Sequence, residues 1–484
     1  KEYRRQRQMC IRDRLYSAVS GLKTHQTRMD VIGNNIANVN TEAFKASNVS
    51  FSEIMYQTTA SASGGNGTTG TGGVNAKQIG LGVTTGSTTV NITGAGASET
   101  TGKPFDLKLT DSQSTNFFIV SDGTNRYFTR AGSFYVDGNG YLCMSSTGYT
   151  LQGWQVDPTT GEIRKDVVSP LQVMSPANQT ASPEATTKAY ASGVLDKNDS
   201  NVNADDGYVM NLGFYDDLGY SYTAKFAVKP IKQNGTVVAG KYQITLTDVI
   251  NSESKSILDA NEAKKKTQIQ SIFGTDGYTI EYDTNKGTFV SIGANGNQKP
   301  VSQLLKMSTL NTGYTTDLGN GQTQKSNFKD IEIDFSKSMN YDNGGTSTFK
   351  MLKGDRTGDG AGKKLGALTG ISVDQQGRIH GSYDNGNTIL LGQIAVAQFA
   401  NASGLEKVGN NCYQTTLNSG EFDGIGVEVN ADGSAIDSGE LEMSNVDLSG
   451  QFTDMIVTQR GFQANSRVIT TSDTLLEELI NLKR

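Results

Sequence analysis

The chain has 484 residues, a formal charge of −6, 56 Gly and only 7 Pro, so Gly, Asn and Asp must make most turns and many short strands are expected. The acidic balance gives no case for a nucleic-acid or anionic-membrane surface, because either would favour clustered Lys and Arg outside any tail. No run of 18 apolar residues exists that would span a bilayer as a helix, and three Cys cannot build a disulfide framework.

The first 14 residues, KEYRRQRQMCIRDR, are strongly basic, with six Lys and Arg against one Glu and one Asp. They lack the apolar segment that a secretory signal peptide requires, and they share no pattern with the residues that follow. We therefore expect residues 1–14 to be a non-native leader, a scar of cloning or sequencing, and we exclude them from the prediction of the fold.

A long amphipathic helix is predicted from Leu15, because apolar residues recur there every seven positions. Such a repeat, about 3.5 residues per turn, is typical of a helix that packs lengthwise on another helix. The helix runs into NNIANVN at residues 34–40, where four Asn are poor helix formers. We expect these Asn to lie off the seam and to offer their amides to neighbouring segments. The predicted seam consists of Leu15, Leu22, Met29, Ile32, Ile36 and Val39.

A matching helix is predicted at the other end of the chain, where Leu441 begins an unbroken seven-residue apolar repeat. The side that carries Gln459, Asn465 and Arg467 is expected to face water or a polar surface. Two ordinary amphipathic helices that close a globular fold would also explain the repeats. Their position at the two ends favours helices that pack on each other and on neighbouring subunits, and that are disordered before assembly. The predicted seam here consists of Leu448, Met455, Phe462, Ile469, Leu476 and Ile480.

Between these helices, the pattern from about residue 76 to 440 predicts short strands joined by turns. The stretch SASGGNGTTGTGG, residues 61–73, reads as a flexible linker. Hairpin turns are predicted at Asp122-Gly123, Asp137-Gly138, Gly377 and Asn385-Gly386. The segment 171–368 is more polar and reads as one or two inserted β domains. The predicted fold class is α+β, with a terminal helical core (15–75 and 441–484), an inner, mainly antiparallel β domain (76–170 and 366–440) and the inserted outer β domain or domains (171–365).

No catalytic, cofactor-binding or metal-binding motif is recognised. The loop DRTGDGAGKKLG, residues 355–366, has Asp at positions 1 and 5 of a calcium-binding loop, but Gly366 stands where the bidentate Glu is required. His25 is predicted to be a partly buried seam residue. Cys143 and Cys412 are predicted to be small apolar residues in strands. The acidic side chains are adequately explained as solvated surface, so no cofactor is expected.

Two long motifs resemble those of the bacterial flagellar rod and hook family of axial proteins. LYSAVSGLKTHQTRMDVIGNNIANVNTEAFKAS is similar to the N-terminal signature of the family, and SNVDLSGQFTDMIVTQRGFQANSRVITTSDTLLEELINLKR to its C-terminal signature in the hook form. The blocks YFTRAGSFYVDGNGYL and GQIAVAQFANASGLEKVGNNCYQTTLNSG resemble its inner β domain. The chain departs from the family at Ala43, where Gly is usual, so a positive φ is less expected there, and at KLTDSQSTNFFIV, which replaces a Gly-rich segment.

The resemblance implies a tubular homopolymer with a core of paired terminal helices and with β domains carried outward. It implies a hook subunit that acts as a universal joint between rod and filament. Its partners would be identical subunits, the rod, the hook-filament junction proteins, the hook cap and the type III export apparatus, and it would reach the cell exterior without a cleaved signal peptide. The alternatives are a distal rod subunit, which should lack the insertion at 171–368, and a secreted enzyme or glycan-binding protein on an axial-protein frame. No nucleic acid or membrane insertion is expected.

Overall fold

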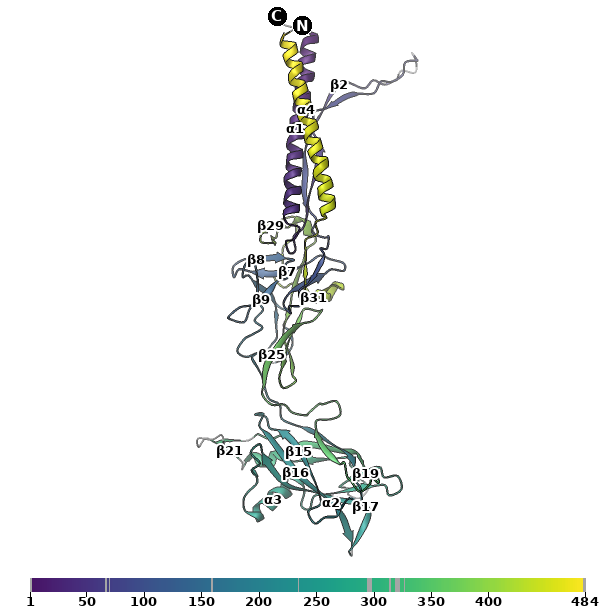
Figure 1. Cartoon of the computed structure of the whole chain (residues 1–484), viewed down its shortest axis with the longest axis vertical. Helices are drawn as coiled ribbons and strands as arrows, with labels where there is room; N and C mark the ends of the chain where they lie inside the picture. The colour runs from purple at the N-terminus through teal and green to yellow at the C-terminus, as the bar shows by residue number, and fades with distance from the viewer. Residues whose placement is uncertain are drawn as a thin grey trace. The chain divides into compact units, whose positions relative to one another are not determined.

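The computed structural model describes residues 2–65, 68, 70–157, 160–233, 235–293, 298–312, 315–317, 323–325 and 327–481. The chain divides into two compact units (Figure 1). Unit 1 comprises Lys1–Ser175, Ile371–Gly381 and Leu390–Arg484, and unit 2 comprises Pro176–Gly370 and Ser382–Ile389. The described secondary structure combines α-helices near both ends of the chain with mostly antiparallel strands between them, as the predicted α+β class requires.

Two long helices, α1 (Glu2–Ala37) and α4 (Leu448–Asn481), belong to unit 1 and lie side by side, drawn in purple and yellow in Figure 1. The carboxylate of Asp447 accepts the main-chain N–H of Ser449 at 3.0 Å, which caps the first turn of α4. Residues 2–14 continue α1, and their being a non-native leader stays a prediction. Among the described residues, no helix combines the length and apolarity needed to cross a membrane.

Two hairpins follow α1 in the chain. Strand β1 (Ser47–Glu53) pairs with β4 (Val83–Val90), and β2 (Tyr56–Ala60) pairs with β3 (Lys77–Gly80). The prediction that residues 61–73 form a linker is wrong for the described part of this stretch, because the strands on both sides pair and Ser63 bridges to Val74. Asn66, Gly67 and Thr69 lie outside the described residues.

The rest of unit 1 is a β structure with two apolar clusters. The predicted hairpins at Asp122-Gly123 and Asp137-Gly138 are confirmed, as β7–β8 and β9–β10. The buried clusters contain Phe117, Phe118 and Trp154. The further strands of unit 1 are β5 (Ser98–Thr100), β6 (Leu107–Thr110), β7 (Asn116–Ser121), β8 (Arg126–Thr129), β9 (Phe134–Val136), β10 (Leu142–Met144), β11 (Thr150–Gln155), β12 (Ser169–Pro170), β28 (Val396–Gln398), β29 (Glu406–Gly409), β30 (Cys412–Gln414), β31 (Ala435–Ser438) and β32 (Glu440–Glu442).

Three strands contribute residues to both units: β25 (Gly366–Val373), β26 (Arg378–Tyr383) and β27 (Thr388–Ile394). They are neighbours in one sheet, and their turns contain the predicted Gly377 and Asn385-Gly386. The main-chain N–H groups of Gly377 and Gly386 donate to Asp374 and Tyr383, respectively. Both glycines have positive φ, which explains why Gly is used at these turns.

Unit 2 contains a five-stranded antiparallel sheet in the order β15-β16-β17-β18-β19 and a four-stranded sheet in the order β20-β23-β14-β24. In the smaller sheet β14 and β23 are parallel. Residues of both sheets share one apolar core that includes Phe226, Phe335 and Phe349. The elements of unit 2 are β13 (Thr180–Ala181), β14 (Lys188–Val194), α2 (Ser200–Asn203), β15 (Tyr208–Tyr215), β16 (Ser221–Gln233), β17 (Thr236–Asn251), α3 (Glu262–Phe273), β18 (Tyr278–Tyr282), β19 (Phe289–Ile292), β20 (Ser302–Leu305), β21 (Thr315–Asp317), β22 (Thr323–Lys325), β23 (Ile331–Met339) and β24 (Lys350–Lys353).

Candidate functional site: the helix pair and a buried charge cluster

Helices α1 and α4 contact each other through polar side chains. The amide Nδ2 of Asn35 donates to Oε1 of Gln451 at 3.0 Å, and the guanidinium of Arg28 lies 3.1 Å from a carboxylate oxygen of Asp454. These partners are more than 400 residues apart in the chain. The pairing of the terminal helices is therefore a long-range tertiary contact within unit 1.

The two helices approach closely because Gly occupies two facing positions. A Cβ atom placed on Gly21 would lie 2.8 Å from the amide of Asn465, and one placed on Gly461 would lie 2.6 Å from the ring of His25. Such distances leave no room for a side chain. Small or polar residues occupy most other buried positions of the pair, namely Ala18, Thr24, Asn35, Thr458 and Ser472, together with the apolar Ile32.

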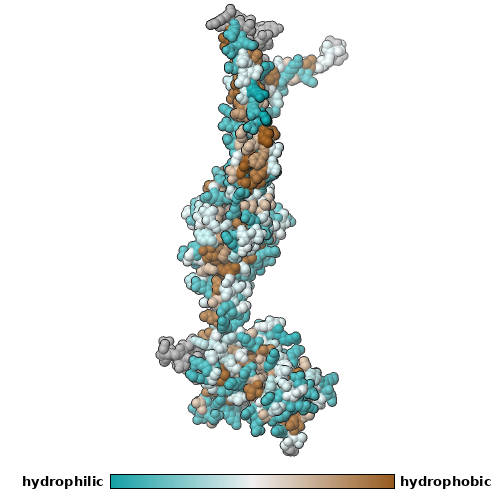
Figure 2. All heavy atoms as spheres, viewed as in Figure 1, coloured by the Kyte–Doolittle hydropathy of each residue, from teal (hydrophilic) through white to brown (hydrophobic). Residues whose placement is uncertain are grey.

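The large apolar side chains of α4 mostly point away from α1. Phe452 is 51% exposed, Ile456 58% and Ile480 67%. Figure 2 shows brown, hydrophobic side chains on the surface of the helical part of unit 1. Since burying apolar surface is the main favourable term in association, these exposed side chains, which lie on several sides of α4, are suited to contact other apolar surfaces. The exposed apolar residues of α4 are Leu448, Phe452, Ile456, Val457, Phe462, Val468, Leu475 and Ile480.

The predicted seam residues are distributed between the inside and the outside of the helix pair. Ile32 is buried, and Leu15, Leu22, Met29 and Ile36 are half-buried. On α4, the half-buried members are Met455, Ile469 and Leu476, whereas Leu448, Phe462 and Ile480 are exposed. Their role in assembly stays a prediction.

Two seam predictions need correction at the helix ends. Helix α1 ends at Ala37, so Val39 lies in the following turn, and α4 begins at Leu448, so Leu441 lies in β32. The turn after α1 forms because the Asn-rich residues bond locally: the side chain of Asn38 donates to the main chain of Asn34 at 2.9 Å, and such bonds compete with a continuing helix.

Two Asn residues lie within the helix pair: Asn35, which was expected to offer its amide to a neighbouring segment, and Asn465, which was expected to face water or a polar surface. Asn35 is buried, and its side chain accepts the N–H of Ser47 at 3.0 Å and donates to the carbonyl of Ser47 at 2.8 Å, besides its bond to Gln451. Asn465 is half-buried against Gly21. The expectation that Asn35 offers its amide to neighbouring segments is confirmed, and its burial is tolerated because a fully hydrogen-bonded amide can be buried at modest cost.

His25 is half-buried between α4 and β1, as predicted. Its ring meets the Phe51 ring edge-on with 5.6 Å between centroids, and its Nδ1 atom has no hydrogen-bond partner among the described residues. Burial, together with the positive charge of Arg28, lowers the pKa of His25. The neutral ring is therefore favoured in the helix pair.

A buried charge cluster lies where the first segment after α1 meets the segment before α4. Lys45 and Glu442 are each 1% exposed, and Lys45 Nζ lies 2.7 Å from Glu442 Oε1 and donates to the carbonyl of Gly94 at 2.7 Å. The same carboxylate oxygen accepts the N–H of Gly96 at 3.0 Å. Glu442 therefore holds together main chain and side chains from both ends of the sequence.

Arg130 extends the cluster into the β structure of unit 1. Its Nε donates to Glu442 Oε2 at 2.9 Å. Its Nη1 donates to the carboxylate of Asp111 at 2.7 Å and to the carbonyl of Asn116 at 2.7 Å. Burial alone would raise the pKa of Glu442, but Arg130 and Lys45 outweigh this effect and lower it. The carboxylate is thus held in its charged form. Nothing in the sequence pattern singled out these four residues, because they come from four separate segments.

The turn that leads into the cluster has an unexpected backbone. Ala43 has φ = 53°, so the prediction that this position avoids positive φ is wrong. Its N–H donates to the carbonyl of Glu442 at 2.8 Å, and the Glu42 carboxylate accepts the N–H groups of Gly132 and Ser133 at 2.8 and 2.9 Å. These bonds offset the strain of a left-handed Ala, which costs roughly 1–2 kcal/mol.

The two cysteines and the loop 355–366 were also considered as candidate sites, and each makes contacts that serve the fold. Cys143 in β10 and Cys412 in β30 are buried and free, as predicted, and burial raises the pKa of Cys412 to about 11. The carboxylate of Asp355 accepts the N–H groups of Thr357 and Asp359 at 2.8 and 3.0 Å. Among the described residues, no three His, Cys, Asp or Glu are arranged to hold a metal ion.

Comparison with known proteins identifies flagellar relatives. Residues 15–45 match the family model "Flagella basal body rod protein", and residues 437–482 match "Flagellar basal body rod FlgEFG protein C-terminal". The chain is 35% identical to the flagellar hook protein FlgE of Borreliella burgdorferi and 32% identical to that of Treponema pallidum, in both cases over 97% of this chain and 99% of the relative.

A rod-named relative is also similar over nearly its full length. The flagellar basal-body rod protein FlgG of Bacillus subtilis is 27% identical over 97% of this chain and 98% of its own. The extent of this alignment does not show which residues of the rod protein, if any, correspond to the segment 171–368. The expectation that rod proteins lack the insertion stays a prediction.

Proposed function

The chain belongs to the family of bacterial flagellar hook proteins, and from this premise we propose that it self-assembles into the curved tube of the hook and transmits torque from rod to filament. The observation that carries the proposal is the similarity to hook-named relatives over nearly the full length of both chains. Both hook proteins have a higher sequence identity to this chain than the relative that is named for the rod. The distal rod subunit is therefore the less favoured alternative.

We propose that α1 and α4 form a coiled-coil-like core domain of the tube, with the inner β domain and the inserted domain carried outside it. The exposed apolar face of α4 supports this role, because it remains unburied in one subunit and a second copy offers a surface to cover it. A subunit with different donor and acceptor surfaces makes heterologous contacts, and such contacts generate an open helical filament. The predicted seam residues would supply these contacts.

We further propose that the buried charge cluster transmits torque within the subunit. A force on the helix pair must reach the β structure through the two chain segments that join them, and Glu442 ties these segments to each other and to Arg130. Charge-assisted hydrogen bonds are strong and directional. Their geometry resists sliding between the segments, whereas a purely apolar contact would allow repacking.

The location follows from the family, and the partners are part of the proposal. The protein is part of the flagellar hook and rod structure. We propose that it is exported by the type III apparatus without a cleaved signal peptide, and that it contacts the rod, the hook cap and the hook-filament junction proteins. The proposal includes no enzymatic activity and no cofactor.

A secreted enzyme or glycan-binding protein is the alternative from another class. Glycan recognition commonly uses an exposed aromatic face, and the single Trp of the chain, Trp154, is buried in unit 1, where its Nε1 donates to the carbonyl of Asp166 at 3.0 Å. No observation on the described residues favours this alternative over the hook.

Immunogold electron microscopy of isolated flagella tests the location. An antibody raised against residues 171–368 is expected to label only the short curved segment between the cell body and the filament. Label on the rod would favour the rod subunit. Plentiful soluble protein without label on any appendage would favour the secreted alternative.

The substitution Phe462→Asp tests the role of α4. It places a charge on the exposed apolar face, and a charge buried without a partner is costly, so we expect tube formation to fail while the monomer stays folded. Gln459→Asp, an equal charge change at an exposed polar position of the same helix, is the matched control and should assemble. Electron microscopy of polymerised samples is the measurement; normal tubes from the Phe462 variant would contradict the assignment.

A further inference from the structure

His25 lies on α1 at a level where both α4 and β1 pack against it. Its ring meets the ring of Phe51 in β1 edge-on, with 5.6 Å between centroids. A Cβ atom placed on Gly461 of α4 would lie 2.7 Å from His25 Nε2 and 3.2 Å from Nδ1. The imidazole therefore packs directly against the main chain of α4, and a change in the ring is felt by both helices.

The site provides no hydrogen-bond acceptor in contact with the Nδ1 atom. This atom is buried and has no partner among the described residues. A neutral imidazole carries one N–H group, whereas the protonated ring carries two and needs an acceptor at each nitrogen. Protonation of His25 would thus leave a buried donor unsatisfied, which is costly.

The charged groups nearest to His25 supply no counter-charge. Arg28, three residues further along α1, is positive, and the Asp454 carboxylate of α4 lies 3.1 Å from its guanidinium. The other His of the chain, His380, lies 3.4 Å from a carboxylate oxygen of Asp374. In the described part of the chain, no carboxylate lies at such a distance from His25.

The other elements around His25 add no free anion. In β1 the Glu53 carboxylate accepts the hydroxyl of Tyr56 at 2.6 Å, and the sequence of β4 contains no charged residue. On α4, Arg460 is exposed and donates to Gln463 at 3.2 Å. A protonated imidazole would therefore lie beside a like charge, without a carboxylate of its own.

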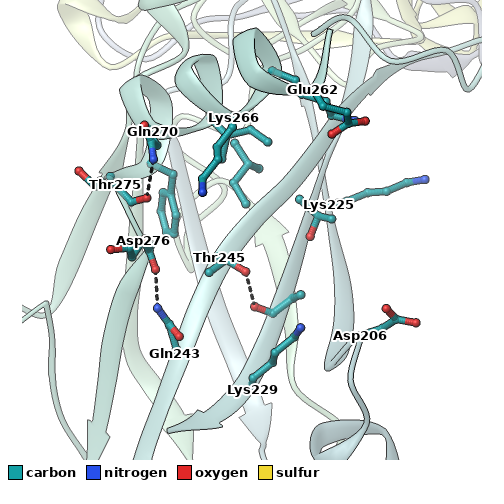
Figure 3. Close-up of a pocket in the computed structure, with 18 of the residues that line it drawn as sticks. Asp206, Lys225, Lys229, Gln243, Thr245, Glu262, Lys266, Gln270, Thr275 and Asp276 are labelled. Atoms are coloured by element: carbon teal, nitrogen blue, oxygen red, sulfur yellow. Dashed lines mark hydrogen bonds between the residues drawn. The ribbon is translucent and has the colours of Figure 1, made fainter. Parts of the chain in front are cut away.

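Charged groups are arranged differently in the groove between α3 and the strands β15, β16 and β17 of unit 2 (Figure 3). Both signs of charge are present there, and most of these side chains are exposed. The gain or loss of one proton is screened by water and by neighbours of opposite sign. The charged residues labelled in Figure 3 are Asp206, Lys225, Lys229, Glu262, Lys266 and Asp276.

We propose that protonation of His25 weakens the contact between α1 and α4 and so makes the helix pair acid-sensitive. The inference concerns the single chain and does not depend on the role in the hook. In the proposed tube every subunit repeats this contact, so acid would also weaken the polymer. That consequence alone rests on the proposed function.

The sign of the pH dependence follows from the surroundings of the ring. Burial, and then the positive charge of Arg28, lower the pKa of His25 in the folded chain. In the unfolded chain the pKa of His is about 6.5. The contribution of the neutral ring to stability is therefore complete above this value, is lost as the pH falls below it, and changes no further below the folded pKa.

NMR titration of the full-length monomer with isotope-labelled His measures the protonation directly. The chain contains two His, so the variant His25→Phe assigns both signals. We expect His25 to titrate below the unperturbed value of about 6.5. A pKa at or above that value overturns the proposal, because it would mean that the ring is solvated or that an acceptor receives its proton. One such acceptor is Thr458 on α4, whose buried Oγ1 atom has no partner among the described residues.

Denaturant titration followed by the circular-dichroism signal of the helices measures the effect on the helix pair. As the pH falls from about 7 to about 5, the unfolding constant of the unmodified chain should rise relative to that of His25→Phe. The rise is at most about tenfold per pH unit, because unfolding takes up one additional proton. The comparison cancels groups that both chains share, such as Glu42, whose pKa is raised by burial.

The matched control is His380→Gln, which removes the other His and should keep the full acid sensitivity of the unmodified chain. His25→Gln repeats the test without adding apolar volume, so that a folding defect of one variant does not decide the result. The measured quantity is the change with pH and not the stability at one pH. Equal acid sensitivity of the unmodified chain and of both His25 variants overturns the proposal.

Discussion

The apolar core of unit 2 buries its large side chains, whereas the helix pair of unit 1 leaves several of its own exposed. In unit 2, Phe226, Phe335 and Phe349 are fully buried between the two sheets. In the helix pair, small and polar residues face each other and Phe452, Ile456 and Val457 remain exposed. Unit 2 therefore buries its hydrophobic surface within one chain, whereas the helix pair leaves much of its own exposed, as the proposed assembly requires.

This difference explains how one sequence can serve folding and assembly separately. Apolar burial stabilises the fold where it occurs inside the chain, and it stabilises a polymer where it occurs only between chains. Polar groups such as Asn35 and Gln451 align α1 and α4. These contacts leave the exposed apolar residues of α4 unburied. Substitutions in the two regions should therefore affect different measurements.

The largest expected difference is between Phe335→Ala and Phe452→Ala. Phe335→Ala creates a cavity in the core of unit 2 and should lower its free energy of unfolding by about 3–5 kcal/mol. Phe452→Ala removes an exposed ring and should change the stability of the monomer by less than about 0.5 kcal/mol, while raising the concentration needed for polymerisation. Denaturant titration followed by circular dichroism, and sedimentation of polymers, measure the two effects. Equal losses of monomer stability would remove the contrast.

A similarly large effect is expected inside unit 1 for Glu442→Gln. The change leaves Lys45 buried without its counter-charge and leaves Arg130 with Asp111 alone, which should cost about 3–5 kcal/mol. Glu440→Gln is the control, because Glu440 pairs with Lys108 at 3.6 Å near the surface and such pairs contribute at most about 1 kcal/mol. Fluorescence of Trp154, the single Trp, reports unfolding of unit 1.

The difference in free energy of unfolding between the unmodified chain and Glu442→Gln should depend on pH. The pKa of Glu442 is lowered in the folded chain, so its contribution to stability is present above the unfolded value of about 4.3 and is lost as the pH falls through the folded pKa. The difference in free energy of unfolding between the unmodified chain and Glu442→Gln should shrink below pH ~4. A difference that is constant with pH would contradict the charged state of Glu442.

A smaller effect is expected at two helix glycines. Gly33→Ala meets no atom within 4 Å and should stabilise α1 by about 0.5–1 kcal/mol, because Ala is the better helix former. Gly461→Ala would press on His25, and the resulting overpacking, about 1–3 kcal/mol, should exceed that gain. Thermal unfolding, followed by the circular-dichroism signal of the helices, distinguishes the two variants. Equal stabilisation by both would mean that the helices are not in close contact at Gly461.

The smallest effect concerns Ala43. Ala43→Gly relieves the left-handed backbone but makes the unfolded chain more flexible, so the free energy of unfolding should stay the same or rise by up to about 1 kcal/mol. Ala46→Gly, at a position without positive φ, should lower it by about 0.5–1 kcal/mol. Trp154 fluorescence measures both variants, and a clear loss of stability in Ala43→Gly would show that its backbone is not strained.

Some failures of the sequence analysis had a recognisable signal. Helix α3 lies in a segment that was interpreted only as β structure, yet Asn261 is a good N-cap residue and accepts the N–H of Ala263 at 3.1 Å. Ile269, Ile272 and Phe273 have the spacing of one helix face, and the last two are buried in the core of unit 2. The pattern was present, but it is short and lies among strands.

The sequence by itself determined the terminal helices, the hairpin turns with Gly and the family, because seven-residue repeats, turn residues and long motifs are local properties. Only the tertiary structure decided that Asn35 is buried, that Ala43 is left-handed and that Lys45, Asp111, Arg130 and Glu442 meet. The physical reason is the same in each case. The cost of burying a polar group or straining a backbone is offset by partners from distant segments, and no local pattern specifies those partners.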